Sequence, residues 1–246
     1  AIPAIFGGYD YTPAAMDARD GLKNSEKHAE ALKLMPELFT EAGFEATLCD
    51  TAYAGYKWVA DMSFYDGMEH VHPYTTIGTY EYEIPDEVRA NSERIQNRNF
   101  FMYSVMKSMP VYTQALIYDE GNYFSTGARM SMSEAFLESY SVLCDLKELT
   151  KIEEGSRDNY IFLDNESTHE ITLLKTPEYE PGVINSVYNY TDDSYVIDGR
   201  RMEMKTERQI SHYHVNMASF LKVGEWLEYL KDEGVYDNTR IIVVSD

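Results

Sequence analysis

The sequence predicts an α/β protein of three layers, α/β/α, with a central and mostly parallel sheet. Three short apolar segments, each bounded by turn residues or by the end of a predicted helix, have the length and composition of strand cores. Two of them follow long stretches with apolar residues at helical spacing, and this recurrence of helix, short loop and strand is typical of the α/β class. Each of the three segments is followed, at once or after one residue, by an aspartate.

The first predicted helix leads directly into the first predicted strand. Apolar residues recur at helical spacing over residues 25–42, where Pro36 marks a break or a fresh first turn and Gly43 a C-terminal stop. The strand is expected at residues 45–49 and ends at Asp50.

The region that follows is predicted to be a helical insertion over residues 57–154. It is rich in Tyr and Met and contains helical stretches at 98–109 and 130–146. The second strand core, residues 160–163, follows the insertion and ends at Asp164. The length of the chain favours one large core with insertions, so residues 1–246 are expected to form a single domain.

The C-terminal part is predicted to contain a hairpin and a long helix. Asp198 and Gly199 lie between two short extended stretches and are typical of a hairpin turn. Residues 207–233 carry apolar residues on one face and end before Gly234, as expected of a long helix.

The third predicted strand covers residues 240–244 and is followed by Ser245 and Asp246. Four consecutive apolar residues are typical of a strand buried on both faces of a parallel sheet. Ligands of open α/β sheets bind beyond the carboxyl ends of the strands, so Asp50, residues 164–169 and Asp246 are expected at one edge. Carboxylates and an imidazole at that edge suit a divalent cation. For each aspartate alone, a helix cap or a turn is the competing interpretation.

Two kinds of side chain extend this hypothetical site. His169 lies among polar groups, five residues after Asp164, where a site role competes with that of a solvated loop residue. Tyr53, Tyr56 and Trp58 follow the first strand, where they either line a substrate mouth or pack as ordinary aromatic residues.

Composition narrows the functional classes. The chain has 42 acidic and 21 basic residues and a formal net charge of −21, which repels a phosphate backbone, so no nucleic-acid partner is expected. No apolar run approaches the roughly 20 residues needed to cross a bilayer, so the fragment itself is expected to be soluble. Cys49 and Cys144 have no metal-type spacing, and free thiols are favoured over a disulfide.

Four segments resemble the sulfatase-like domain of the alkaline phosphatase superfamily. Residues 2–13, IPAIFGGYDYTP, resemble the stretch just downstream of the family's nucleophile. Residues 34–46, LMPELFTEAGFEA, are similar to a helix and strand of the family, and residues 235–246, VYDNTRIIVVSD, to its terminal metal-binding motif. Residues 167–170, STHE, resemble the mid-domain S-x-H motif of lipoteichoic acid synthases and phosphoethanolamine transferases.

The resemblance implies an alkaline phosphatase-like fold and a metal-dependent reaction. It makes Asp246 a ligand of a divalent metal ion, whether Mn, Zn, Mg or Ca, and His169 a contact of the transferred group on the substrate. The nucleophilic Ser or Thr is then expected upstream of Ala1, so no catalytic nucleophile is assigned within the chain, and the domain is expected to be incomplete at both ends.

The function implied is hydrolysis or transfer of a phosphate or sulfate ester group on a cell-envelope substrate, lipid-linked substrates included. The fragment alone is expected to be inactive. The parent protein is expected to be anchored by segments outside this chain and to act on the extracytoplasmic face of a bacterial cell membrane. The alternative is a noncatalytic binding or structural domain that retains the fold.

Overall fold

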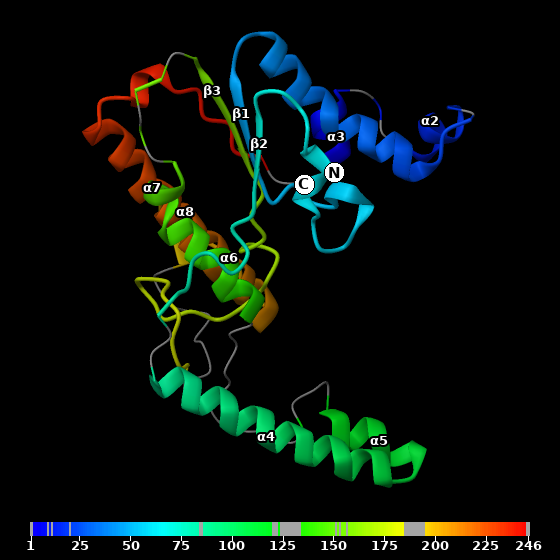
Figure 1. Cartoon of the computed structure of the whole chain (residues 1–246). Helices are drawn as coiled ribbons and strands as arrows, with labels where there is room; N and C mark the ends of the chain where they lie inside the picture. The colour runs from blue at the N-terminus through cyan, green and yellow to red at the C-terminus, as the bar shows by residue number, and fades with distance from the viewer. Residues whose placement is uncertain are drawn as a thin grey trace. The chain divides into compact units, whose positions relative to one another are not determined.

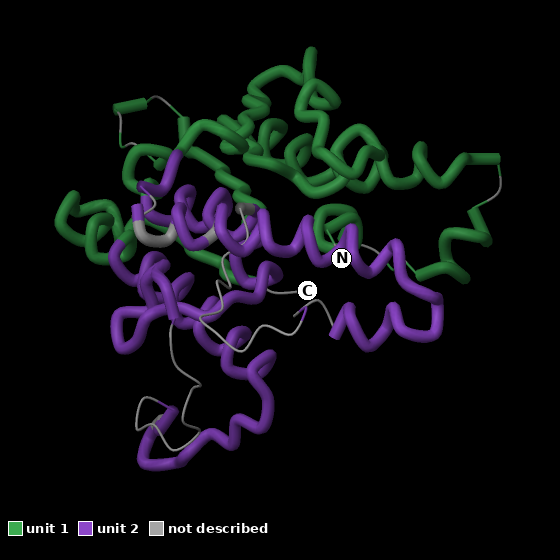
Figure 2. The backbone as a smooth tube through the Cα atoms, turned by 90° about the horizontal axis from the view of Figure 1, so that it is seen from below, with its two compact units in different colours: residues 1–80, 145–165, 226–246 green, residues 81–144, 166–225 purple. Residues whose placement is uncertain are grey.

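The structure is a computed structural model of the 246-residue chain, and it divides into two compact units (Figure 2). The first unit consists of residues 1–80, 145–165 and 226–246, and the second of residues 81–144 and 166–225. The predicted insertion at residues 57–154 contributes to both units, and the single domain stays a prediction. The residues that the structure describes are 2–8, 10, 12–19, 21–83, 86–119, 123, 134–150, 152, 154–155, 157–184 and 195–244.

The first unit contains a parallel sheet of three strands in the order β2-β1-β3 (Figure 1). Its strands are β1 (Glu45–Cys49), β2 (Val71–Tyr74) and β3 (Asn159–Leu163). The central strand β1 places Cys49 opposite Tyr74 on one side and opposite Leu163 on the other. The α/β class and the parallel sheet are therefore confirmed, and β1 and β3 lie where the sequence predicts strands.

The strand β2 is one that the sequence pattern does not predict. It contains His72 and Pro73, and proline cannot donate a hydrogen bond to a ladder. Because β2 pairs with β1 on one side only, in the described sheet it is an edge strand, where proline is tolerated. Pairing with β1, rather than local propensity, makes these four residues a strand.

The core of the first unit lies between the sheet and its N-terminal helices. Helix α1 (Ile2–Gly7) contributes Phe6 and helix α3 (Asn24–Glu41) contributes Leu32 to a cluster with the fully buried Ala46 and Leu48 of β1. The helix predicted at residues 25–42 is thus confirmed as α3, and it continues through Pro36 without a break. The remaining short helices of this unit are α2 (Pro13–Asp17), η1 (Ala54–Tyr56), η2 (Met62–Tyr65), α7 (Leu146–Leu149) and η5 (Tyr236–Asn238).

The prediction of a strand at residues 240–244 is wrong. These residues form no strand, and Ile242, Val243 and Val244 are 76%, 66% and 61% exposed. The four apolar residues have the composition of a strand, but a strand also needs a neighbouring backbone with which to pair. The segment pairs with none of the strands in the described part of the chain, and β3 is an edge of the sheet there.

The second unit is mainly helical. It contains α4 (Asp86–Ser108), α5 (Val111–Tyr118), α6 (Glu134–Cys144) and most of α8 (Glu207–Asp232), of which the last residues belong to the first unit. The predicted long helix is confirmed as α8, and the predicted hairpin as the antiparallel pair β4 (Val196–Ile197) and β5 (Arg200–Arg201). One core cluster of this unit consists of Phe136, Leu137, Tyr140, Leu174, Tyr179, Val215 and Ala218.

None of the helices in the described residues combines the length and the apolarity that crossing a bilayer requires.

Candidate functional site

Two aspartates lie at the carboxyl ends of neighbouring parallel strands. Asp50 follows β1 and Asp164 follows β3, and the last residues of these strands, Cys49 and Leu163, are directly opposite each other. Both aspartates therefore occupy the same edge of the sheet, as the sequence predicts for this pair. Asp246, the third member of the predicted group, lies outside the described residues, and its place at this edge stays a prediction.

Asp50 holds the chain that leaves β2. Its Oδ2 accepts a hydrogen bond from the backbone N–H of Thr76 at 2.9 Å and another from the Thr76 hydroxyl. Its own backbone N–H donates to the Tyr74 carbonyl at 3.2 Å, and its φ of 48° is in the left-handed region. The other carboxylate oxygen, Oδ1, is buried and has no hydrogen-bond partner among the described residues. One oxygen of Asp50 thus has a structural role and the other is free to accept.

Asp164 holds the loop that follows β1. Its Oδ2 accepts from the backbone N–H of Ala52 at 3.1 Å, and its backbone N–H donates to the Cys49 carbonyl at 3.2 Å. Both aspartates therefore stabilise the loops at this edge, which is the role of the competing turn or cap interpretation.

The loop after β1 exposes three aromatic side chains at this end of the strand. Trp58 is 86% exposed, Tyr56 56% and Tyr53 47%, so these residues are not core packing. Tyr53 packs edge-to-face on Trp58 at 5.8 Å between ring centroids, and Tyr56 contacts His28 at 5.4 Å. Tyr53 and Tyr56 also have left-handed φ values of 59° and 58°. Left-handed backbone and exposed aromatic rings together make this loop a candidate ligand contact.

The cysteine beside this edge is unsuited to nucleophilic chemistry. Cys49 is fully buried in β1, and burial raises the pKa of its thiol to about 12, so it stays protonated at neutral pH. No disulfide joins Cys49 and Cys144, which agrees with the interpretation that the sequence favours.

His169 lies in a turn of the second unit. Its side chain is exposed, and its backbone N–H donates to the Glu166 carbonyl at 2.9 Å. The neighbouring Ser167 is buried, and its hydroxyl lies 2.8 Å from that of Ser219 on α8, so the turn is held by a buried contact. Because Asp50 and Asp164 belong to the first unit, the nearness of His169 to them stays a prediction.

The described residues do not by themselves form a metal site. They contain no group of three or more His, Cys, Asp or Glu side chains that could hold a metal ion. At the carboxyl edge they offer one unpartnered carboxylate oxygen, Oδ1 of Asp50. A divalent ion requires further oxygen or nitrogen ligands, so the predicted metal depends on Asp246 and stays a proposal.

A second charged cluster, which the sequence pattern does not reveal, lies at the opposite end of β1. The carboxylate of Glu45 lies 3.0 Å from Nδ1 of His70, 2.8 Å from Nε2 of His72 and 3.5 Å from Nε of Arg157. The hydrogen bond with His72 is the main cause that lowers the pKa of the Glu45 carboxyl. This cluster joins residues of all three strand regions, and its distance along β1 from Asp50 separates it from the carboxyl edge.

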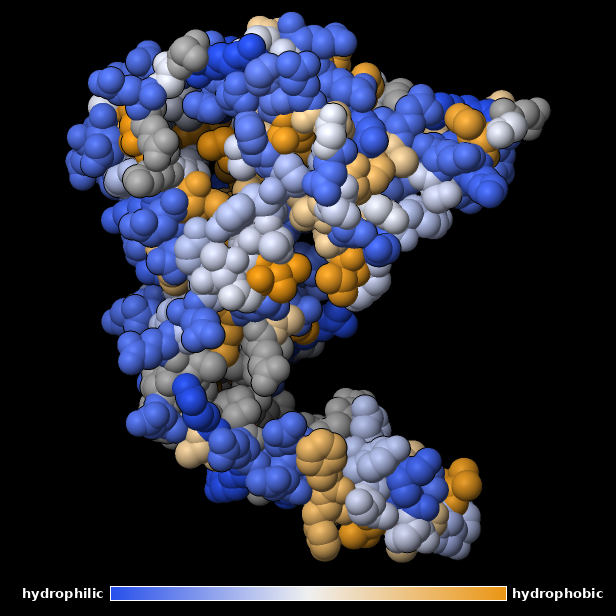
Figure 3. Space-filling view, in the orientation of Figure 1, coloured by the Kyte–Doolittle hydropathy of each residue, from blue (hydrophilic) through white to orange (hydrophobic). Residues whose placement is uncertain are grey.

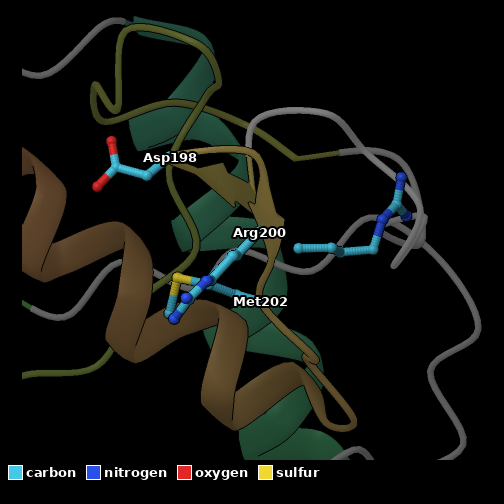
Figure 4. Close-up of a pocket in the computed structure, with 4 residues that line it drawn as sticks. Asp198, Arg200 and Met202 are labelled. Atoms are coloured by element: carbon cyan, nitrogen blue, oxygen red, sulfur yellow. The ribbon is translucent and has the colours of Figure 1, made fainter.

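The pocket in Figure 4 lies at the β4–β5 hairpin of the second unit. It is lined by Asp198, Arg200, Arg201 and Met202. Arg200 and Arg201 are successive residues of β5, and successive side chains of a strand point to opposite faces. The two side chains therefore leave the backbone in opposite directions, and the pocket is a weaker candidate than the carboxyl edge.

Comparison with known proteins adds no assignment. No protein-family model matches the chain, and no curated protein and no solved structure matches it.

Proposed function

We propose that this chain is part of a metal-dependent enzyme that hydrolyses or transfers a phosphate or sulfate ester group on an extracytoplasmic, cell-envelope substrate. The observation that carries the proposal is the pair of aspartates at the carboxyl ends of adjacent parallel strands, with Oδ1 of Asp50 buried and unpartnered among the described residues. A buried acceptor without a partner is costly unless a bound group satisfies it. This edge is also where open α/β sheets bind their ligands.

The proposal includes the finer fold, a three-layer α/β/α domain of alkaline phosphatase type. It is supported by the parallel pairing of β1 with β2 and β3 and by the packing of α1 and α3 on the β1 core. A parallel sheet is normally covered by helices on both faces, because its strands are joined by helical crossovers.

Each residue of the proposed site has a distinct task. A divalent ion, when bound, would stabilise the nucleophilic alkoxide and the charge that develops on the ester oxygens. Asp246 would be one of its ligands, and His169 would donate a hydrogen bond to a non-bridging oxygen or to the leaving group. The exposed rings of Tyr53 and Trp58 would contact the apolar part of the substrate alcohol. The nucleophilic Ser or Thr would come from residues that precede Ala1.

A noncatalytic binding or structural domain is the second candidate. It is favoured by the hydrogen bonds of Asp50 and Asp164, since both carboxylates already stabilise loops, and by the lack of a three-ligand group in the described part of the chain. In this case the fold is retained and the edge binds a ligand without transforming it.

The test is an activity assay of the protein with the residues that flank this chain. Aryl sulfate, aryl phosphate and lipid-linked phosphate donors are offered in turn with Mn, Zn, Mg and Ca. We expect turnover of one substrate class, loss of turnover in Asp246→Asn, and a fall of about 100-fold to 1,000-fold in His169→Ala with an unchanged thermal midpoint. The 246-residue chain alone should be inactive.

A matched control is His212→Ala, a histidine of α8 to which the proposal gives no role. Normal turnover in His169→Ala would remove the substrate contact from the proposal. If no substrate is turned over with any of the four metals, the noncatalytic domain is the better description.

A further inference from the structure

One segment of this acidic chain has no acidic residue. Residues 94–118 contain no Asp or Glu, although 42 of the 246 residues are acidic. The same segment contains three basic residues, Arg94, Arg98 and Lys107. Its local charge is therefore opposite in sign to the net charge of −21.

This segment folds as a helical hairpin in the second unit. It comprises the second half of α4 and all of α5, which pack against each other (Figure 1). The turn between them is well defined, since the N–H of Met109 donates to the Met106 carbonyl at 3.1 Å and that of Thr113 to the Pro110 carbonyl at 2.9 Å. Ile117 is buried, so the hairpin has an inner side.

The hairpin exposes large apolar side chains. The most exposed are Phe100 (63%), Phe101 (67%), Val111 (81%), Tyr112 (85%) and Leu116 (69%). Figure 3 shows apolar residues, in orange and pale orange, mixed with polar ones over α4 and α5. Five large apolar side chains exposed on one hairpin make it a candidate surface for binding another molecule.

We propose that the α4–α5 hairpin binds the surface of an anionic membrane and lies in the plane of the interface. Aromatic residues favour the boundary between lipid headgroups and acyl chains, where their apolar rings are buried and their polar groups stay hydrated. Arg94 and Lys107 are exposed on the same hairpin and are attracted by anionic headgroups. No carboxylate within residues 94–118 opposes this attraction, and the nearest exposed ones, Glu93 and Asp119, lie at its two ends.

Charge distinguishes this partner from a second copy of the chain. In a symmetric pair of copies the hairpin would meet a second hairpin of the same positive charge, so the contact would gain no overall attraction between opposite charges. Anionic headgroups neutralise these charges instead. A protein with a net charge of −21 is otherwise repelled by an anionic membrane, so an acid-free, basic segment is where contact with the lipid can occur.

The experiment is flotation of the 246-residue chain with two kinds of vesicle, one of phosphatidylcholine alone and one with about a third phosphatidylglycerol. We expect the chain to float with the anionic vesicles, and less with the neutral ones or at high salt, where the Debye length shrinks to about 3 Å. The variant Arg94→Glu/Lys107→Glu should bind the anionic vesicles about tenfold less tightly or worse. The variant Tyr112→Ser/Leu116→Ser should lose binding to a similar extent, because its exposed apolar contacts are removed.

Two variants of the same unit serve as matched controls. Lys205→Glu/Arg208→Glu reverses two exposed charges, and Phe220→Ser/Leu221→Ser replaces two exposed apolar residues, both outside the hairpin. Both should float like the parent chain. The proposal is overturned if the parent floats with neither vesicle or if the hairpin variants bind as well as the controls. It is also overturned if the parent chain binds no lipid but self-associates, and if this self-association is lost in Tyr112→Ser/Leu116→Ser. Since flotation needs no turnover, failure of the proposed enzyme would not change this result.

Discussion

Thr76 shows how much of the carboxyl edge depends on a single side chain. It is buried and binds Asp50 through both its backbone N–H and its hydroxyl. Thr76→Val keeps the shape of the side chain but removes the hydroxyl donor. Of the two hydrogen bonds that Thr76 donates to Asp50, only the one from the backbone N–H then remains. Hydrogen bonds to charged groups contribute about 1.5–3 kcal/mol, and we expect the free energy of unfolding to fall by about that amount in a urea titration.

Thr79→Val is the matched control for this substitution. Thr79 is exposed and its hydroxyl donates to the Thr75 carbonyl at 3.1 Å, so its loss should change stability by no more than about 0.5 kcal/mol. Equal losses in the two variants would show that the bond to Asp50 has no special weight.

His28 gives the stability of the first unit a dependence on pH. Its imidazole is buried beside Tyr56, and burial lowers its pKa below the ordinary value of 6.5. The unfolded chain therefore binds a proton more readily than the folded one. Stability is fully present above pH 6.5 and is lost as the pH falls from there towards the folded pKa. The measurement is the free energy of unfolding across this pH window for the parent and for His28→Gln. The variant should lack the loss of stability that protonation of His28 causes. Curves of equal slope for the two proteins would contradict this prediction.

At the scale of single elements, the end of α3 follows from local sequence. Gly43 has a φ of 97°, and its N–H donates to the Thr40 carbonyl while that of Phe44 donates to the Phe39 carbonyl, both at 3.0 Å. This is a Schellman motif, and its usual hydrophobic contact is the edge-to-face pair of Phe39 and Phe44. Gly43→Ala places a side chain in a left-handed conformation and should destabilise the protein by about 1–2 kcal/mol in chemical denaturation.

Gly224→Ala is expected to stabilise the protein, in contrast to Gly43→Ala. Gly224 lies within α8, and an added Cβ would meet no atom within 4 Å. Alanine is the better helix former, so this variant should gain about 0.5–1 kcal/mol. A loss of stability in both variants would show that the backbone conformation of Gly43 is not the cause of its effect.

At the scale of the whole molecule, local signals could be read from the sequence and pairing could not. The elements α3, α8, β1 and β3 were predictable because apolar spacing, glycine stops and short apolar runs act within a few residues. The strand β2 was missed, since Pro73 argues against a strand and only pairing with β1 makes it one. Residues 240–244 show the opposite error: their composition predicts a strand, but they form none, because composition does not guarantee a neighbouring strand with which to pair.

The candidate site also combines features that the sequence predicts with features that only the fold shows. The sequence places Asp50 and Asp164 at strand ends and could therefore predict their shared edge, because parallel strands end together. It gives no sign of Thr76 as the partner of Asp50, and it does not show which carboxylate oxygen stays unpartnered among the described residues. The roles of Asp246 and His169 stay predictions that rest on motif resemblance.

Local sequence patterns are sufficient for the α/β class, the positions of α3 and α8, the net charge of −21 and the absence of acidic residues from positions 94–118. Which strands pair, which acids hold which loops, and which apolar side chains of the hairpin are exposed depend on the tertiary structure. The physical reason is range. Helical spacing and charge are local properties, whereas a hydrogen bond such as that between Ala52 and Asp164, 112 positions apart, forms only once folding brings these two residues together.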